Sequence, residues 1–113
     1  MTITLRFRAR DKEIFEAIKS GAKTVETRAG TAKYQNVKVG NSLICVCGGE
    51  KLEKSIAAFT IFKTPEALVK KYKPRSIHPA ATSLADLLKM WHSFPGYKEK
   101  IAQFGIAAFE LKQ

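Results

Sequence analysis

The alternation of apolar and polar residues predicts five β-strands along this chain. Residues 2–9 read TITLRFRA, in which every second residue is apolar. A period of two is typical of a half-buried strand, and it places Arg6 and Arg8 on the polar face. Further strands are expected at residues 24–28, 42–46, 54–63 and 106–111.

Helical spacing of apolar residues predicts three or four short helices. Ile14, Phe15 and Ile18 form an apolar stripe that begins after Asp11, a residue type that caps helices, and ends at Gly21. A second helix is expected from Thr64-Pro65-Glu66 to the residue before Pro74, because proline follows a cap well but cannot continue a helix. The others are expected at residues 83–91 and 97–104, with residues 75–81 forming a loop.

These elements favour an α+β fold rather than a parallel sheet. The strands are short, the connections are irregular, and there are too few crossover helices for repeated βαβ units. We therefore expect a curled, mostly antiparallel sheet of about five strands with the helices packed around it. A chain of 113 residues has the length of one domain, so a single domain is expected over 1–113.

Charge adds an expectation about partners. Lys and Arg total 20 and Asp and Glu total 10, which gives a net charge of +10. Such an excess suits phosphates, nucleotides or RNA, although a surface that favours solubility is the alternative explanation. No apolar run approaches the ~18 residues of a membrane span, and arginines interrupt the first ten residues where a secretory signal would be apolar. We expect a cytoplasmic protein with no membrane partner.

Cys45 and Cys47 lie two residues apart in a predicted strand. They could begin a metal site with His78 and His92, but their spacing is not that of a zinc ribbon or finger. Two reduced thiols on a strand that packs into the core are the simpler interpretation. The sequence therefore predicts no metal and no cofactor.

The densest polar cluster is the segment 21–28, GAKTVETR, where a helix ends and a strand begins. Strand geometry places Glu26 and Arg28 on one face, within about 7 Å of each other. Lys23 stands at the strand entrance and can turn toward them. A lysine, a carboxylate and an arginine in a cleft can bind an anion or perform acid–base chemistry. The alternative is a solvated strand with a weak salt bridge.

Gly21, Lys23, Glu26 and Arg28 also carry a family resemblance. Their spacing, G-x-K-x-x-E-x-R after a short amphipathic helix, resembles the signature of the ASCH domain family. The Val-Gly-Asn turn at 39–41 and the closing strand GIAAFEL are similar to the same family. The resemblance implies a small PUA-like open β-barrel over nearly the whole chain.

The resemblance implies two activities. One is RNA binding by a non-catalytic module. The other, found in compact bacterial members, is hydrolysis of the acyl group of N(4)-acetylcytidine and related acylated cytosines. Lys23 matches the lysine of that amidohydrolase motif, while Glu26 stands where the best-known form has threonine. No Glu occupies the third position in the later helical region, where this chain offers His78 and Asp86.

A metal-independent amidohydrolase is the predicted function, with RNA binding as the alternative. Lys23 and Glu26 are the candidate catalytic residues, and the charge of Arg28 is expected to lower the pKa of Lys23. The candidate substrate-binding residues are Arg28, Thr24, Tyr97, Arg6 and His78. The aromatic residues that can stack on a base are Trp91, Tyr97, Phe7 and Tyr34, although core packing is the alternative for Trp91 and Phe7.

RNA would bind through the basic run of Lys70, Lys71, Lys73 and Arg75, with Tyr72 stacking on a base. The alternative is a set of cations that stabilise a helix C-terminus, next to one tyrosine of the core.

Overall fold

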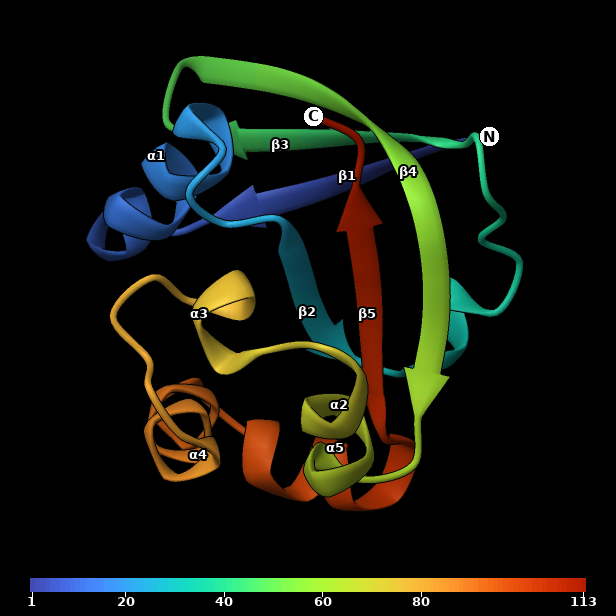
Figure 1. The fold of residues 1–113 in the computed structure, drawn as a ribbon. Helices are drawn as coiled ribbons and strands as arrows, with labels where there is room; N and C mark the ends of the chain where they lie inside the picture. Colours follow the sequence, from blue (N-terminus) through green and yellow to red (C-terminus); the bar gives the residue numbers. More distant parts are fainter.

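Five strands form one curled sheet in the computed structural model, which describes all residues 1–113. Their order across the sheet is β1-β3-β4-β5-β2, so β1 and β2 are the two edge strands (Figure 1). The strands are β1 (Thr2–Phe7), β2 (Val25–Ala29), β3 (Ser42–Cys47), β4 (Glu50–Phe62) and β5 (Ile106–Leu111).

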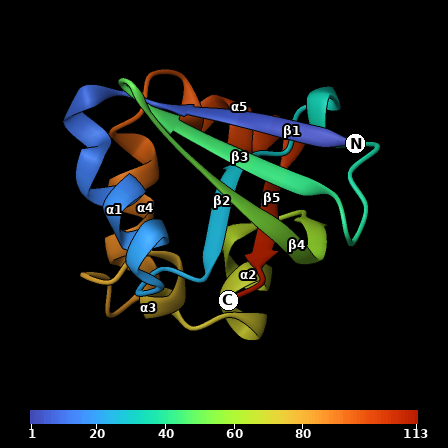
Figure 2. The same ribbon diagram turned by 90° about the horizontal axis from the view of Figure 1, so that it is seen from above.

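Helices occupy the connections between the strands. The α-helices are α1 (Lys12–Ser20), α2 (Pro65–Lys71), α3 (Pro74–Ile77), α4 (Leu84–His92) and α5 (Tyr97–Phe104), and the 3-10 helices are η1 (Ala9–Asp11) and η2 (Ala32–Tyr34). Helix α1 packs beside β3, whereas α2 to α5 gather around the half of the sheet that contains β2 and β5 (Figures 1 and 2).

Strand β4 turns the sheet into an open barrel. Its first half pairs antiparallel with β3, and after an irregularity between Ile56 and Ala58 its second half pairs antiparallel with β5. Strand β1 runs parallel to β3, the one parallel pair, and β2 runs antiparallel to β5. The barrel is therefore open between β1 and β2, the strands that were predicted to carry the arginines and the acid–base cluster.

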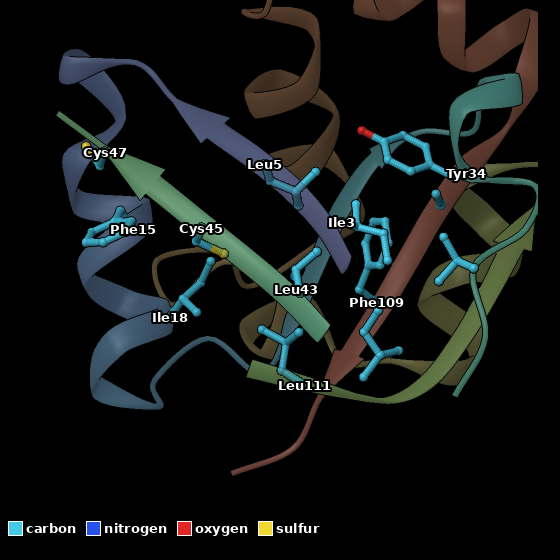
Figure 3. Packing of buried hydrophobic residues seen from close by; sticks show 13 residues of the cluster. Ile3, Leu5, Phe15, Ile18, Tyr34, Leu43, Cys45, Cys47, Phe109 and Leu111 are labelled. Carbon is cyan, nitrogen blue, oxygen red and sulfur yellow. The ribbon is translucent and has the colours of Figure 1, made fainter. Parts of the chain in front are cut away.

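Two apolar cores lie on opposite faces of β5. Phe109 and Leu111 face the barrel interior with Leu5, Phe15 and the other residues in Figure 3. Ile106 and Ala108 face the opposite way, toward the core formed with helices α2 to α5. Burial on both faces explains why β5 reads as a continuous apolar run, GIAAFEL, rather than as an alternating one.

The α+β open barrel predicted from the sequence is confirmed, and its strand boundaries differ by a few residues. Strand β4 begins at Glu50 rather than at residue 54, because the mostly polar residues 50–55 form a strand half in which every second residue is exposed to solvent. Five α-helices are present rather than three or four. The additional one, α3, begins at Pro74, so this proline starts a new helix within the predicted loop 75–81.

Asp11 occupies the predicted N-terminal position of helix α1, but its side chain makes no capping hydrogen bond. It pairs instead with Arg8, with 2.7 Å between Arg8 Nε and Asp11 Oδ2. No helix in the structure is long and apolar enough to cross a membrane.

Candidate functional site

A cavity of about 220 Å³ opens where the barrel is open, between the edge strands β1 and β2. Strand β1 and the residue after it contribute Arg6, Phe7 and Arg8, and the β2 segment contributes Lys23 and residues 26–28. Helix α4 and the turn into α5 close the remaining side. We call this cavity the barrel pocket. It joins residues from distant parts of the chain because both uncovered sheet edges lie beside it.

Lys23 lies at the floor of the barrel pocket. Gly21 adopts the left-handed conformation that ends α1, with φ of 86°, and the chain then turns directly into β2. The Lys23 side chain is only 1% exposed, and its ammonium group donates a hydrogen bond to the carbonyl oxygen of Ile77 at the end of α3. A lysine that is held by a carbonyl in the interior is a positioned charge rather than a surface cation.

Glu26 is the partner of Lys23 on the same floor. Its side chain is 5% exposed, and its Oε1 lies 3.3 Å from Lys23 Nζ and accepts a hydrogen bond of 2.8 Å from the backbone N–H of Thr27. The second oxygen, Oε2, is buried and accepts no hydrogen bond, although Arg28 Nη2 lies 3.5 Å away at ion-pair distance. Glu26 therefore keeps one carboxylate oxygen that can accept a hydrogen bond from a ligand or a water molecule that reaches the floor.

Arg28 joins the two edges of the open barrel. Its guanidinium group lies 3.5 Å from the carbonyl oxygen of Arg6 on β1 and 4.8 Å from the centre of the Phe7 ring. The side chain is 21% exposed, so it forms part of the pocket wall between the buried floor and solvent. This cation–π contact and the ion pair with Glu26 fix the guanidinium in place.

Burial and mutual charge set the pKa values of this cluster. Burial lowers the pKa of Lys23, and this effect exceeds the opposing attraction of Glu26. Burial alone would raise the pKa of Glu26, but the charges of Lys23 and Arg28 and the Thr27 N–H bring it below its usual value. The predicted direction for Lys23 is thus confirmed, while its main cause is burial and the repulsion from Arg28 is a smaller contribution.

Aromatic rings line the pocket above the charged floor. Phe7, Phe94 and Tyr97 all contact the cavity, and Phe94 and Tyr97 pack edge to face with ring centres 5.2 Å apart. Two of the predicted stacking residues, Trp91 and Tyr34, belong to the apolar cores and do not line the pocket. The pocket thus combines flat apolar walls with a polar floor, as a site for a planar heterocycle requires.

Thr27 joins the pocket wall to helix α4. Its Oγ1 accepts a hydrogen bond of 3.0 Å from Trp91 Nε1 on α4, and both side chains are buried. An indole N–H can only donate, so the Thr27 hydroxyl must accept there, and its own hydrogen is left for another acceptor. Thr27 also lines the cavity, so this hydrogen bond ties the wall of the pocket to helix α4.

Replacing Trp91 with phenylalanine should destabilise the protein by about 1–3 kcal/mol, because the buried Thr27 hydroxyl loses its partner. Urea unfolding of Trp91→Phe, Thr27→Val and the double variant measures this coupling. We expect the double variant to cost clearly less than the sum of the two single variants. Additive costs would show that the hydrogen bond contributes nothing.

The structure separates two predicted site residues from the others. Lys23, Glu26, Arg28, Arg6 and Tyr97 all line the barrel pocket. Thr24 does not, because it lies just before β2 and instead lines a separate shallow hollow together with Lys73 and Arg75. His78 does not line the pocket either, since its Nδ1 accepts a hydrogen bond of 3.1 Å from the Ala80 N–H within its own turn.

Besides Glu26, the acidic residue of the pocket is Asp11, which was expected only as a helix cap and which lines the pocket next to Arg8. Asp86, the residue offered for the third position of the amidohydrolase motif, accepts hydrogen bonds from Thr82 in its own turn and lies outside the pocket. Phe94 was also missed. Asp11 follows the polar end of the first strand, and Phe94 precedes the Pro-Gly turn at 95–96. These positions are the signals that could have indicated the two residues, but neither position reveals which cavity its side chain lines.

The basic run lies outside the pocket. Lys70, Lys71, Lys73 and Arg75 are all exposed, whereas Tyr72 is buried in the helical core and therefore cannot stack on a base. Cys45 and Cys47 are both buried free thiols, and burial raises the pKa of Cys45 to about 12. No three His, Cys, Asp or Glu side chains are grouped as metal ligands would be.

Solved structures with the same fold are known. The crystal structure of hypothetical protein PH0355 has a TM-score of 0.83 and 21% sequence identity, and the match covers 99% of this chain and 98% of that one. The solution NMR structure of protein PF0455 from Pyrococcus furiosus has a TM-score of 0.72 and 21% identity, over 99% and 96% of the two chains. No family model matches the chain, and no curated protein matches it. At this identity the two structures establish the fold alone.

Proposed function

We propose that this protein is an amidohydrolase that removes the acyl group from N(4)-acetylcytidine and related N(4)-acylated cytosines. The observation that carries the proposal is the buried Lys23–Glu26 pair on the floor of an aromatic-walled pocket. A buried charge pair with one unsatisfied carboxylate oxygen is unfavourable for stability alone, and such groups are typical of sites that act on a ligand.

Glu26 is the proposed general base. Its free Oε2 accepts a proton from a water molecule, whose oxygen attacks the carbonyl carbon of the acyl group. The lowered pKa keeps Glu26 ionised across the neutral range, at some cost in base strength. The Thr27 N–H and Lys23 hold Oε1, so Oε2 is the oxygen that takes the proton.

Lys23 is the proposed electrophilic group and proton donor. Two of its three N–H donors face Ile77 and Glu26, which leaves the third for the acyl oxygen as negative charge develops there. As the carbon–nitrogen bond breaks, a proton passes to the departing N(4) amine, and the products are cytidine and acetate. The lowered pKa of Lys23 makes this ammonium a better proton donor than an ordinary lysine.

The aromatic walls orient the base in this proposal. Phe7, Phe94 and Tyr97 provide faces and edges for a flat pyrimidine. The electron-poor amine of cytosine is a good leaving group, so these residues require no Lewis acid.

The proposal is tested by identifying the products. Purified protein treated with a metal chelator should convert N(4)-acetylcytidine to equal amounts of cytidine and acetate, as resolved by chromatography, at the rate of untreated protein. Conversion that stops after chelation and returns with added metal would contradict the mechanism. Failure to form cytidine under any condition would overturn the function.

A further inference from the structure

The barrel pocket is a small cavity that opens at an exposed rim. Its volume of about 220 Å³ is below the ~300–1,000 Å³ of pockets that enclose drug-sized ligands. The N(4) amide and the ribose are attached at opposite ends of the cytosine ring. A base whose amide reaches Lys23 and Glu26 on the floor therefore directs its ribose out of the pocket, across the rim.

The rim is cationic on the side of β1. Arg6 and Arg8 are both exposed and both line the pocket. Arg8 is engaged, because its guanidinium pairs with Asp11 at 2.7 Å and lies 5.3 Å from the centre of the Phe94 ring. The guanidinium of Arg6 forms no ion pair and no hydrogen bond, while its backbone carbonyl faces Arg28.

The charges around the pocket do not balance. Four cationic side chains line it, and only the carboxylates of Asp11 and Glu26 oppose them. Asp11 is committed to Arg8, and Glu26 is shared between Lys23 and Arg28. Arg6 is therefore the cation with no compensating group, and it lies on the exposed rim of the pocket.

We propose that the substrate carries a phosphate on its ribose and that Arg6 binds this phosphate at the pocket rim, with Arg8 beside it. This inference rests on the proposed function and names the substrate more closely, as a 5′-mononucleotide of an N(4)-acylated cytidine. Arginine suits this role because its planar guanidinium donates two parallel hydrogen bonds to phosphate oxygens. Asp11 keeps Arg8 oriented along the rim until the phosphate arrives.

Binding of the product is the most direct test, because it does not depend on turnover. Calorimetry should show that cytidine 5′-monophosphate binds the wild-type protein at least about tenfold more tightly than cytidine. A charge-assisted hydrogen bond to the phosphate is enough to give a difference in affinity of this size. Arg6→Gln should remove this preference and leave cytidine binding unchanged. Arg10→Gln is the matched control, since Arg10 is exposed in the same segment but does not line the pocket.

Equal affinity for the nucleotide and the nucleoside would overturn the inference, and so would equal losses in Arg6→Gln and Arg10→Gln. The mononucleotide is also overturned as the ligand if a short single-stranded oligonucleotide binds more tightly and Arg6→Gln weakens that binding. The ligand at Arg6 would then be a phosphodiester chain.

Hydrolysis of acetylcytidine and of its 5′-monophosphate, measured in parallel, separates this inference from the proposed function. Turnover of both at equal kcat/KM overturns the phosphate site and leaves the amidohydrolase intact. Preferential, Arg6-dependent binding of the nucleotide without turnover of either compound supports the phosphate site and overturns the amidohydrolase.

Discussion

Replacing Lys23 with methionine should lower kcat for hydrolysis of N(4)-acetylcytidine by at least about 1,000-fold, because one side chain both stabilises the developing oxyanion and supplies the proton to the amine. Methionine preserves the length and much of the volume of the buried side chain, so the pocket keeps its shape. Steady-state kinetics with chromatographic detection of cytidine measures the loss.

The same substitution is expected to weaken the fold, and a second change separates the two effects. Without Lys23, the buried carboxylate of Glu26 keeps only the more distant Arg28, and breaking a buried ion pair costs about 3–5 kcal/mol. The double variant Lys23→Met/Glu26→Gln removes the stranded charge and should recover much of this stability in urea unfolding. It should remain inactive. Recovery of activity along with stability would mean that Lys23 acts only through the fold.

Replacing Glu26 with glutamine should lower kcat by about 100-fold or more, because the amide keeps the shape of the carboxylate but cannot accept the proton of water. The KM for acetylcytidine should change little, since the aromatic walls are unaffected. Arg10→Gln, a surface change of similar size outside the pocket, should keep the wild-type rate. A Glu26→Gln variant with at least half of the wild-type rate would exclude Glu26 as the base.

The pH dependence of Glu26→Gln provides a further readout of the charge coupling. Glu26 raises the pKa of Lys23 against the larger effect of burial, so its removal lowers that pKa further. Because the proton donor must be protonated, the alkaline limb of residual kcat/KM should move to lower pH than in the wild type. In both proteins this limb should lie below the ordinary lysine pKa of ~10.4.

The acid side of the stability profile depends on Glu26 itself. Its pKa is lower in the folded than in the unfolded protein, so the folded state binds this proton less tightly. The carboxylate therefore contributes stability that is complete above the unfolded value of ~4.3 and is lost as the pH falls through the lower folded value. Glu26→Gln should flatten the loss of stability over that acidic range.

Local pattern was sufficient to predict the strands and most of the helices. Period-two alternation in β1, the apolar stripe of α1 and the Thr64-Pro65-Glu66 helix start each depend on neighbours in sequence, so the sequence alone specifies them. Helix α3 was missed because Pro74, which ends one helix, is equally suited to begin the next.

The charged residues at the centre of the site were easier to predict than the residues that complete the pocket around them. Lys23, Glu26 and Arg28 share one short segment, and strand periodicity is enough to place the last two together. Asp11 and Phe94 reach the same pocket only because the edge strands β1 and β2 flank the open side of the barrel and the α4–α5 turn closes it. That arrangement depends on sheet order, which no local pattern contains.

Burial was the second property that the sequence did not reveal. A Lys-x-x-Glu pair in a polar octapeptide is compatible with a solvated surface strand, yet Lys23 and Glu26 are among the most buried polar side chains of the molecule. Lys23 donates its hydrogen bond to Ile77 at the end of α3, 54 residues further along the chain, and no local pattern contains that contact.

The rate of hydrolysis of N(4)-acetylcytidine, followed by the change in its ultraviolet absorbance, tests the central claim most directly when wild-type protein and Lys23→Ala are assayed side by side at equal concentration. The assignment predicts steady conversion to cytidine by the wild type, insensitive to chelator, and almost none by the variant. No absorbance change with the wild type, or equal rates for the two proteins, would contradict it.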